Sequence, residues 1–285
     1  MLGSWYWKRI IWSLRKVWLP ICADDLVLDV GSGNNPHPAA DILLERHIDS
    51  THRFGAPVVM DRPFVLGNAC KMPFKNKTFD YIIAFHVLEH MADPASFLKE
   101  LQRVGKAGYI ETPNAMFERL IPYDVHLLEV MCNEDTLLIH KKESARPDPF
   151  INKLDIVSKN QSWKRLFYGN PDLFHVRYFW KENIQFKIVN PEVSCDWFVE
   201  PDSQGLVDEK ITSYASSTTL RSLGLLLLRL YYRFRKKKVI NLEELLVCPE
   251  CYGALSNDKD FLSCFECRVR YPKKPVHDFN RPVPI

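Results

Sequence analysis

A short apolar segment that runs directly into a glycine turn constrains the fold of this chain more than any other feature. Residues 26–30, Leu-Val-Leu-Asp-Val, are followed at once by Gly31-Ser32-Gly33. Glycines allow the backbone of such a turn to approach a ligand closely. Around it, short apolar runs and a helical pattern alternate along the chain, at residues 26–30, 40–45, 79–85, 94–104 and 107–112. This alternation predicts an α/β fold, with a doubly wound and mostly parallel sheet that binds ligands at the carboxyl ends of its strands.

Composition narrows the class of protein. With 46% hydrophobic and 26% charged residues, the chain is too apolar to be disordered and too ordinary in its mixture to be a fibre. A formal net charge of +3 argues against a surface that binds polyanions over the whole molecule. The longest uncharged apolar run, residues 222–228, is far shorter than the ~20 residues of a spanning helix. The N-terminus has no cleavage site typical of a signal peptide, so we expect a cytoplasmic protein.

The glycine turn fits a dinucleotide-binding site poorly. That fingerprint requires a third glycine and an acid ~20 residues further on, whereas here Asp29 precedes the first glycine. The segment from Asp29 through Gly31 and Gly33 to Asn35 instead resembles motif I of the class I S-adenosylmethionine-dependent methyltransferases, of the type 11-like group, with Asn35 in place of the last glycine. Three further segments continue the resemblance in the same order along the chain: residues 41–45, 66–74 and 79–90.

This resemblance implies a Rossmann-like sheet of the seven-stranded type and S-adenosyl-L-methionine as the cofactor. It implies that Glu45, at the end of the second strand, binds the ribose hydroxyls. Asn68 replaces the family's aspartate that accepts from the adenine amino group, and the backbone N–H of the next residue contacts the ring. The cofactor-binding residues implied are Asp29, Gly31, Ser32, Gly33, Glu45, Asn68, Ala69 and His86.

Candidate catalytic bases follow the fourth and fifth predicted strands. Methyl transfer depends mostly on orientation and desolvation, but a hydroxyl acceptor must also lose its proton. His86, Glu111 and His126 are the candidates for that role. Each has an alternative: His86 as a contact to the cofactor's carboxylate, Glu111 as a contact to substrate hydroxyls or a residue that orders its turn, and His126 as a structural histidine.

The segment His86-Val-Leu-Glu89-His90 also spells the H-x-x-E-H pattern of some zinc peptidases. On a helix, its two histidines would share a face. The strand directly before it and the lack of an obvious third ligand argue against this interpretation. We therefore expect His90 to pack or cap locally.

Four cysteines near the C-terminus form two C-x-x-C pairs, which twelve residues separate: Cys248, Cys251, Cys264 and Cys267. Each pair can form a knuckle that presents two thiolates, and a hairpin would join the knuckles into a tetrahedral Cys₄ site. A unit this small lacks a sufficient core, so the metal would supply much of its folding free energy. We expect Zn²⁺, since nothing else in the chain supports the alternative of iron–sulfur chemistry.

The sequence around these cysteines, residues 241–275, resembles a small zinc-ribbon family. Its members include separate activating subunits of methyltransferases that act on transfer RNA, ribosomal RNA and release factors. The resemblance implies a fused stabiliser that covers an apolar surface of the catalytic domain. A ribbon with only a structural role and a ribbon that binds nucleic acid are the alternatives.

We predict four parts of the chain: a basic and aromatic amphipathic helix at 1–20, a methyltransferase domain at 21–215, a basic leucine-rich helix or linker at 216–240 and a zinc ribbon at 241–285. Basic charge beside Trp and Leu in the two helices suits an anionic membrane surface, which would place the protein on the inner face of a membrane. Packing within the chain and contact with RNA are the alternatives for these helices.

The predicted acceptor of the methyl group depends on a motif that this chain lacks. Amide and amine methyltransferases of this fold carry Asn/Asp-Pro-Pro-aromatic after the fourth strand, where this chain has Ala84-Phe85-His86. We therefore expect O-methylation of a glycan or lipid-linked sugar at a membrane surface. The alternatives are a methyltransferase of RNA or a translation factor, and a non-catalytic scaffold that binds the cofactor.

Overall fold

A computed structural model describes residues 19–49, 56–144, 160–198, 227–232, 234 and 240–285. The predicted helix at 1–20 lies outside the described residues except for its last two, and so does most of the predicted segment 216–240. Among the described residues, no helix is long and apolar enough to cross a membrane.

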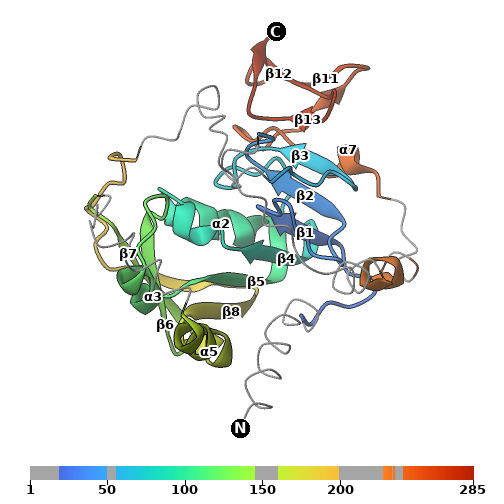
Figure 1. Ribbon diagram of the computed structural model, residues 1–285. Coiled ribbons are helices and arrows are strands. Elements are labelled where there is room, and N and C mark those ends of the chain that lie inside the picture. The colour runs from blue at the N-terminus through green and yellow to red at the C-terminus, as the bar shows by residue number, and fades with distance from the viewer. Residues whose placement is uncertain (1–18, 50–55, 145–159, 199–226, 233, 235–239) are drawn as a thin grey trace. The chain divides into compact units, whose positions relative to one another are not determined.

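A seven-stranded sheet forms the centre of the fold and confirms the predicted α/β class (Figure 1). The order of its strands is β13-β3-β2-β1-β4-β5-β8. Their bounds are β1 Val27–Val30, β2 Ile42–Glu45, β3 Phe64–Leu66, β4 Phe79–Phe85, β5 Gly105–Pro113, β8 His175–Lys181 and β13 His277–Asp278. The pairs β1–β2, β2–β3 and β3–β13 are parallel. The sheet has the predicted seven strands. One of them, the edge strand β13, comes from the C-terminal cysteine-containing region and not from the predicted methyltransferase domain.

The central strands are apolar because they are buried on both faces. All residues of β1, β2 and β3 are buried, and β4 has a single half-buried residue, Asp80. Continuous apolar runs are typical of parallel strands covered on both faces. The Asp80 carboxylate accepts a hydrogen bond from the Leu26 backbone N–H at 2.9 Å, which ties the beginning of β4 to the residue before β1.

The helix α2, Pro94–Val104, has the bounds predicted from its pattern. It begins with proline, which suits the first turn because its missing N–H has no partner there. Phe97, Leu98, Leu101 and Val104 are fully buried and form its apolar face. The next residue, Gly105, begins β5 with no loop between the two elements.

Two smaller sheets complete the described structure. One has the order β6-β7-β9, with β6 Leu128–Asn133, β7 Thr136–Lys141 and β9 Gln185–Ile188. The other has the order β10-β11-β12-β14, with β10 Ser256–Asn257, β11 Phe261–Cys264, β12 Val269–Pro272 and β14 Val283–Pro284. Further helices are η3 Leu88–His90, α3 Ala115–Leu120, α5 Gln161–Gly169, η4 Pro171–Leu173 and α7 Leu242–Leu245, and residues 227–232 and 234 are also helical.

The chain forms two compact units, each made of non-contiguous segments. The first contains residues 1–20, 84–95 and 109–200, and the second contains residues 21–83, 96–108 and 201–285. The second unit therefore combines the glycine turn with the cysteine-containing region. The predicted four-part division stays a prediction.

Candidate functional site

The glycine turn after β1 has the backbone conformation that glycine favours. Gly31 and Gly33 have φ angles of 66° and 57°, in the left-handed region where other residues are strained. The Gly31 N–H donates to the Leu44 carbonyl oxygen at 2.9 Å, which holds the turn against β2. The two glycines of the motif are thus required by the backbone itself.

Glu45, the last residue of β2, closes this turn. Its side chain is buried, and Oε1 accepts hydrogen bonds from the Ser32 hydroxyl at 2.9 Å and from the Gly33 N–H. The structure therefore brings together three of the predicted cofactor-binding residues, from two neighbouring strand ends.

Asp29 lies beneath the turn. Its carboxylate is buried and accepts from the His37 backbone N–H at 2.7 Å. The His37 ring accepts in turn from the Ala39 N–H at 3.1 Å through Nδ1. Asp29 thus shapes the segment that follows the glycine turn.

Asn68 lines a cavity of about 650 Å³ at the carboxyl ends of β2 and β3. Its side-chain oxygen accepts from the Cys70 N–H at 2.9 Å, so it caps the turn that also contains Ala69. The cavity is lined by the segments that follow β2 and β3 and by the C-terminal region, at residues 249–250, Tyr271 and 278–282. No motif in the sequence indicated this contribution from the C-terminal region.

His86 contacts two buried carboxylates, although its own side chain is 41% exposed. It follows β4 with a φ angle of 54°, and its N–H donates to the Glu111 carbonyl oxygen at 2.7 Å. Its ring Nδ1 lies 3.1 Å from Glu89 Oε1, and Nε2 lies 3.4 Å from Glu111 Oε1. Thr112 and Tyr109 donate their hydroxyls to the other oxygens of Glu89 and Glu111, at 2.9 and 2.7 Å.

This arrangement makes His86 a proton donor at neutral pH. Burial lowers the pKa of His86, but hydrogen bonds and charge from Glu111 and Glu89 outweigh it and raise the pKa to about 9. Burial would raise the pKa of Glu89, yet the hydrogen bond and charge of His86 hold it at about 2. His86 therefore has the character of an imidazolium between two carboxylates, which disfavours the predicted role of a base.

His126 belongs to a second buried cluster. Its Nδ1 lies 2.7 Å from Glu118 Oε2, and the Lys142 ammonium lies 2.5 Å from Glu118 Oε1. All three side chains are buried. Of these three residues, only His126 was predicted from the sequence. Glu118 lies in α3, and Lys142 directly follows β7.

The helix required by the H-x-x-E-H interpretation does not form. Only Leu88–His90 is helical, as the single 3₁₀ turn η3, and His86 lies before it with a left-handed backbone. The two histidines of the pattern therefore do not share a helical face. His90 Nδ1 lies 2.9 Å from the carbonyl oxygen of Val125, 35 residues further along the chain, so the ring does not make the local cap that was predicted.

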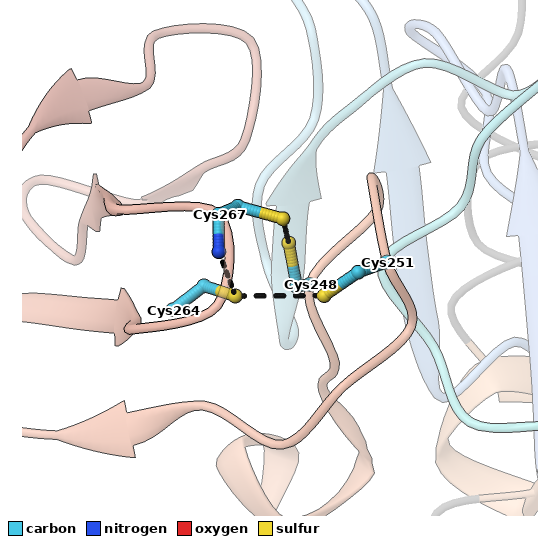
Figure 2. A group of neighbouring side chains, drawn as sticks. All are labelled: Cys248, Cys251, Cys264 and Cys267. Atoms are coloured by element: carbon cyan, nitrogen blue, oxygen red, sulfur yellow. Dashed lines mark hydrogen bonds between the residues drawn. The ribbon is translucent and has the colours of Figure 1, made fainter.

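The four C-terminal cysteines converge (Figure 2). Their sulfur atoms all lie within 4.8 Å of one another, with 3.8 Å between Cys248 and Cys267 and 3.5 Å between Cys251 and Cys264. A tetrahedral zinc ion bound at ~2.3 Å separates its sulfur ligands by ~3.8 Å. Backbone N–H groups of Gly253 and Cys267 point to the sulfurs of Cys251 and Cys264, both at 3.4 Å. The cluster is compatible with a zinc ribbon.

Residues 43–110 match the family model described as a methyltransferase domain. The matched segment begins in β2 and ends in β5, so it contains Glu45, Asn68 and His86. An uncharacterized methyltransferase of Schizosaccharomyces pombe (strain 972) is 47% identical over 45 residues, which is 16% of this chain and 16% of that protein. Ajmaline N-methyltransferase of Rauvolfia serpentina is 36% identical over 45 residues, again 16% of each chain. The chain thus matches 16% of the length of each of these relatives.

Solved structures overlap with part of this chain. The YcgJ protein of Bacillus subtilis has a TM-score of 0.32 at 19% identity, over 44% of this chain and 62% of its own. A complex of the Haloferax volcanii Trm112 methyltransferase activator with a protein described as a methyltransferase has a TM-score of 0.38 at 12% identity. That overlap covers 62% of this chain and 90% of the other.

Proposed function

We propose that this protein is an S-adenosylmethionine-dependent methyltransferase whose cofactor binds at the glycine turn after β1. The contact of Glu45 with Ser32 and Gly33 carries the proposal, because it joins the acid of the second strand to the turn of the first. Both parts were implied by the same resemblance, and the acid lies inside the segment that matches the methyltransferase domain.

The residues present suit an adenosyl group. A carboxylate has about four lone-pair sites, so Glu45 can hold the turn and still accept from ribose hydroxyls. Asn68 borders a cavity of about 650 Å³, within the ~300–1,000 Å³ typical of small-molecule sites. Residues 46–49, directly after Glu45, line this cavity, whereas Glu45 and the glycine turn do not. When bound, S-adenosylmethionine supplies a methyl group on a cationic sulfur. The chain's own contribution is to orient that group and to exclude water.

For the acceptor, we favour the oxygen of a glycan or lipid-linked sugar at an anionic membrane surface. His86 stands where methyltransferases of planar nitrogen carry their own motif, which supports an oxygen. Helical residues 227–232 and 234 support a membrane surface, because their apolar side chains Leu227, Tyr231 and Phe234 are 58%, 49% and 83% exposed. Exposed apolar groups beside basic residues are typical of interfacial helices.

We assign Zn²⁺ to the four cysteines and a stabilising role to the ribbon that they hold. The Phe279 N–H donates to the Leu66 carbonyl oxygen at 2.8 Å, and the Val247 N–H donates to the Pro73 carbonyl oxygen at 3.0 Å. Tyr252 directly follows Cys251, and its hydroxyl donates a hydrogen bond to the Glu100 carboxylate of α2 at 3.1 Å. These contacts cover the outer edge of β3 and one end of α2, as expected of a fused stabiliser.

The proposal is tested by titrating the full chain with S-adenosylhomocysteine in a calorimeter. We expect one binding site, and we expect Glu45→Gln to weaken binding at least about tenfold, because a hydrogen bond to a charged group is worth ~1.5–3 kcal/mol. Glu192→Gln, at an exposed position outside the site, is the matched control and should bind like the wild type. Absence of binding heat from the wild type, or equal affinities for all three proteins, would refute the cofactor site.

A further inference from the structure

A second group of potential metal ligands lies in the unit that does not contain the four clustered cysteines. One ligand atom from each of Glu89, His90 and His126 lies within 4.8 Å of the other two. Glu89 and His90 belong to η3, which follows β4, and His126 precedes β6. The proposed methyltransferase chemistry assigns no role to this cluster as a whole.

The hydrogen bonds of the two histidines fix their tautomers. His90 Nδ1 lies 2.9 Å from the Val125 carbonyl oxygen, which can only accept, so this nitrogen carries a proton. His126 Nδ1 lies 2.7 Å from Glu118, whose carboxylate is held by the Lys142 ammonium, so it is also a donor. In a neutral imidazole, Nε2 then has the lone pair. Both rings thus present the nitrogen that a metal ion requires.

These outer partners have the pattern found around bound metals. Histidines that bind a metal almost always donate their other N–H to a carbonyl or carboxylate, which orients the ring and increases its basicity. His90 has the carbonyl partner and His126 has the carboxylate partner. Glu118 is 2% exposed, so its negative charge is buried directly behind the His126 ring.

Hydrogen bonds also fix the orientation of the Glu89 carboxylate. Its side chain is 1% exposed, and its two oxygens contact His86 Nδ1 at 3.1 Å and the Thr112 hydroxyl at 2.9 Å. Each carboxylate oxygen has a second lone pair, so these contacts leave acceptor sites. The carboxylate is therefore fixed in orientation beside the two imidazoles.

We propose that Glu89, His90 and His126 bind a divalent transition-metal ion with an open coordination position. Two imidazoles and one carboxylate suit Zn²⁺, Fe²⁺, Mn²⁺ or Co²⁺ more than Mg²⁺ or Ca²⁺, which prefer oxygen ligands. Ligands of a tetrahedral ion at ~2.1 Å lie ~3.4 Å apart, so small side-chain rotations close the observed cluster. His90 is exposed, so the open position is accessible to an oxygen donor of a bound molecule.

This site is chemically distinct from the cysteine cluster, and the two can be counted separately. We would strip the untagged full chain of metal and titrate it with Co²⁺, following absorbance and bound metal. We expect two equivalents, of which only one produces sulfur-to-cobalt charge-transfer absorption. Cys264→Ser should lose that equivalent, and His90→Ala should lose the other.

Two further variants separate metal binding from general damage. Glu118→Gln keeps the shape of the positioning residue behind His126 and should weaken the second equivalent about 10–100-fold. His47→Ala, in the other unit, is the matched histidine control and should retain both equivalents.

A single equivalent in the wild type, all of it with sulfur charge transfer, would overturn the proposal. So would a His90→Ala protein that keeps two equivalents. Neither result depends on cofactor binding, because metal is counted without S-adenosylmethionine. A wild-type protein that binds the cofactor but only one metal ion would reject this site alone. A wild-type protein that binds two metal ions but no cofactor would reject only the proposed function.

Discussion

Buried glutamates organise this molecule at the scale of single residues. Glu45, Glu89 and Glu118 are 7%, 1% and 2% exposed, and each contacts groups that determine the local geometry. Glu45 holds the glycine turn, Glu89 holds His86, and Glu118 holds His126. A buried carboxylate is costly unless it is paired and hydrogen-bonded. We therefore regard these contacts as the main constraints on the candidate sites.

Gly105 provides a test of packing at a single residue. A Cβ at this position would lie 2.5 Å from Ile82 Cδ1 and 3.2 Å from the Leu101 carbonyl oxygen. We expect Gly105→Ala to lower the free energy of unfolding by ~1–3 kcal/mol, since overpacking displaces neighbours. The loss, measured by urea denaturation, should be smaller in an Ile82→Ala background, which removes both Cδ1 and Cγ1 of Ile82. Equal losses in both backgrounds would contradict this packing account.

The spacing of the sequence motif was sufficient to predict that Glu45 lies near the glycine turn, whereas its binding of the cofactor stays a prediction. An acid, two glycines and a second acid at the end of the next strand lie close along the chain, and parallel strands bring their ends together. The environment of the candidate bases could not be predicted in this way. Glu118 and Lys142 are 24 residues apart and meet only through the β6–β7 hairpin, and the contact of His86 with Glu111 requires the pairing of neighbouring strands.

At the scale of elements, the edge of the sheet is the main difference from expectation. No strand was predicted in the C-terminal residues after the cysteines, yet His277–Asp278 forms β13 and pairs with β3. A two-residue strand has no detectable hydrophobic period, so the sequence pattern could not indicate it. Its position covers an edge that would otherwise expose unpaired backbone groups.

The helical residues near 230 give an element-scale prediction. We expect the full chain to float with vesicles of phosphatidylcholine and phosphatidylglycerol. Leu227→Ser together with Phe234→Ser should reduce the bound fraction by at least about tenfold, because burial of each such side chain is worth ~1.5–3 kcal/mol.

The matched control for this flotation experiment is Leu173→Ser, which changes an apolar residue of similar exposure, 51%, in η4. It should bind the vesicles like the wild type. Equal flotation of the double variant and the control would remove the membrane from the account. Binding of the wild-type protein to RNA, without binding to vesicles, would favour the nucleic-acid alternative.

At the scale of the whole molecule, the chain divides in a way that a linear domain map does not describe. Residues 96–108 group with residues 21–83 and 201–285, while residues 84–95 group with residues 109–200. Strands β4 and β5 therefore begin in one unit and end in the other, as their bounds require. Sequence patterns predict elements along the chain, but such grouping depends on contacts between distant segments.

The most direct measurement is the backbone amide spectrum of the ¹⁵N-labelled full chain during titration with S-adenosylhomocysteine. We expect the amides of Ser32, Gly33 and Asn68 to shift together with one affinity, while that of Leu138 in β7 stays unchanged. Unchanged amides in the glycine turn at saturating ligand, or shifts confined to other parts of the chain, would contradict it.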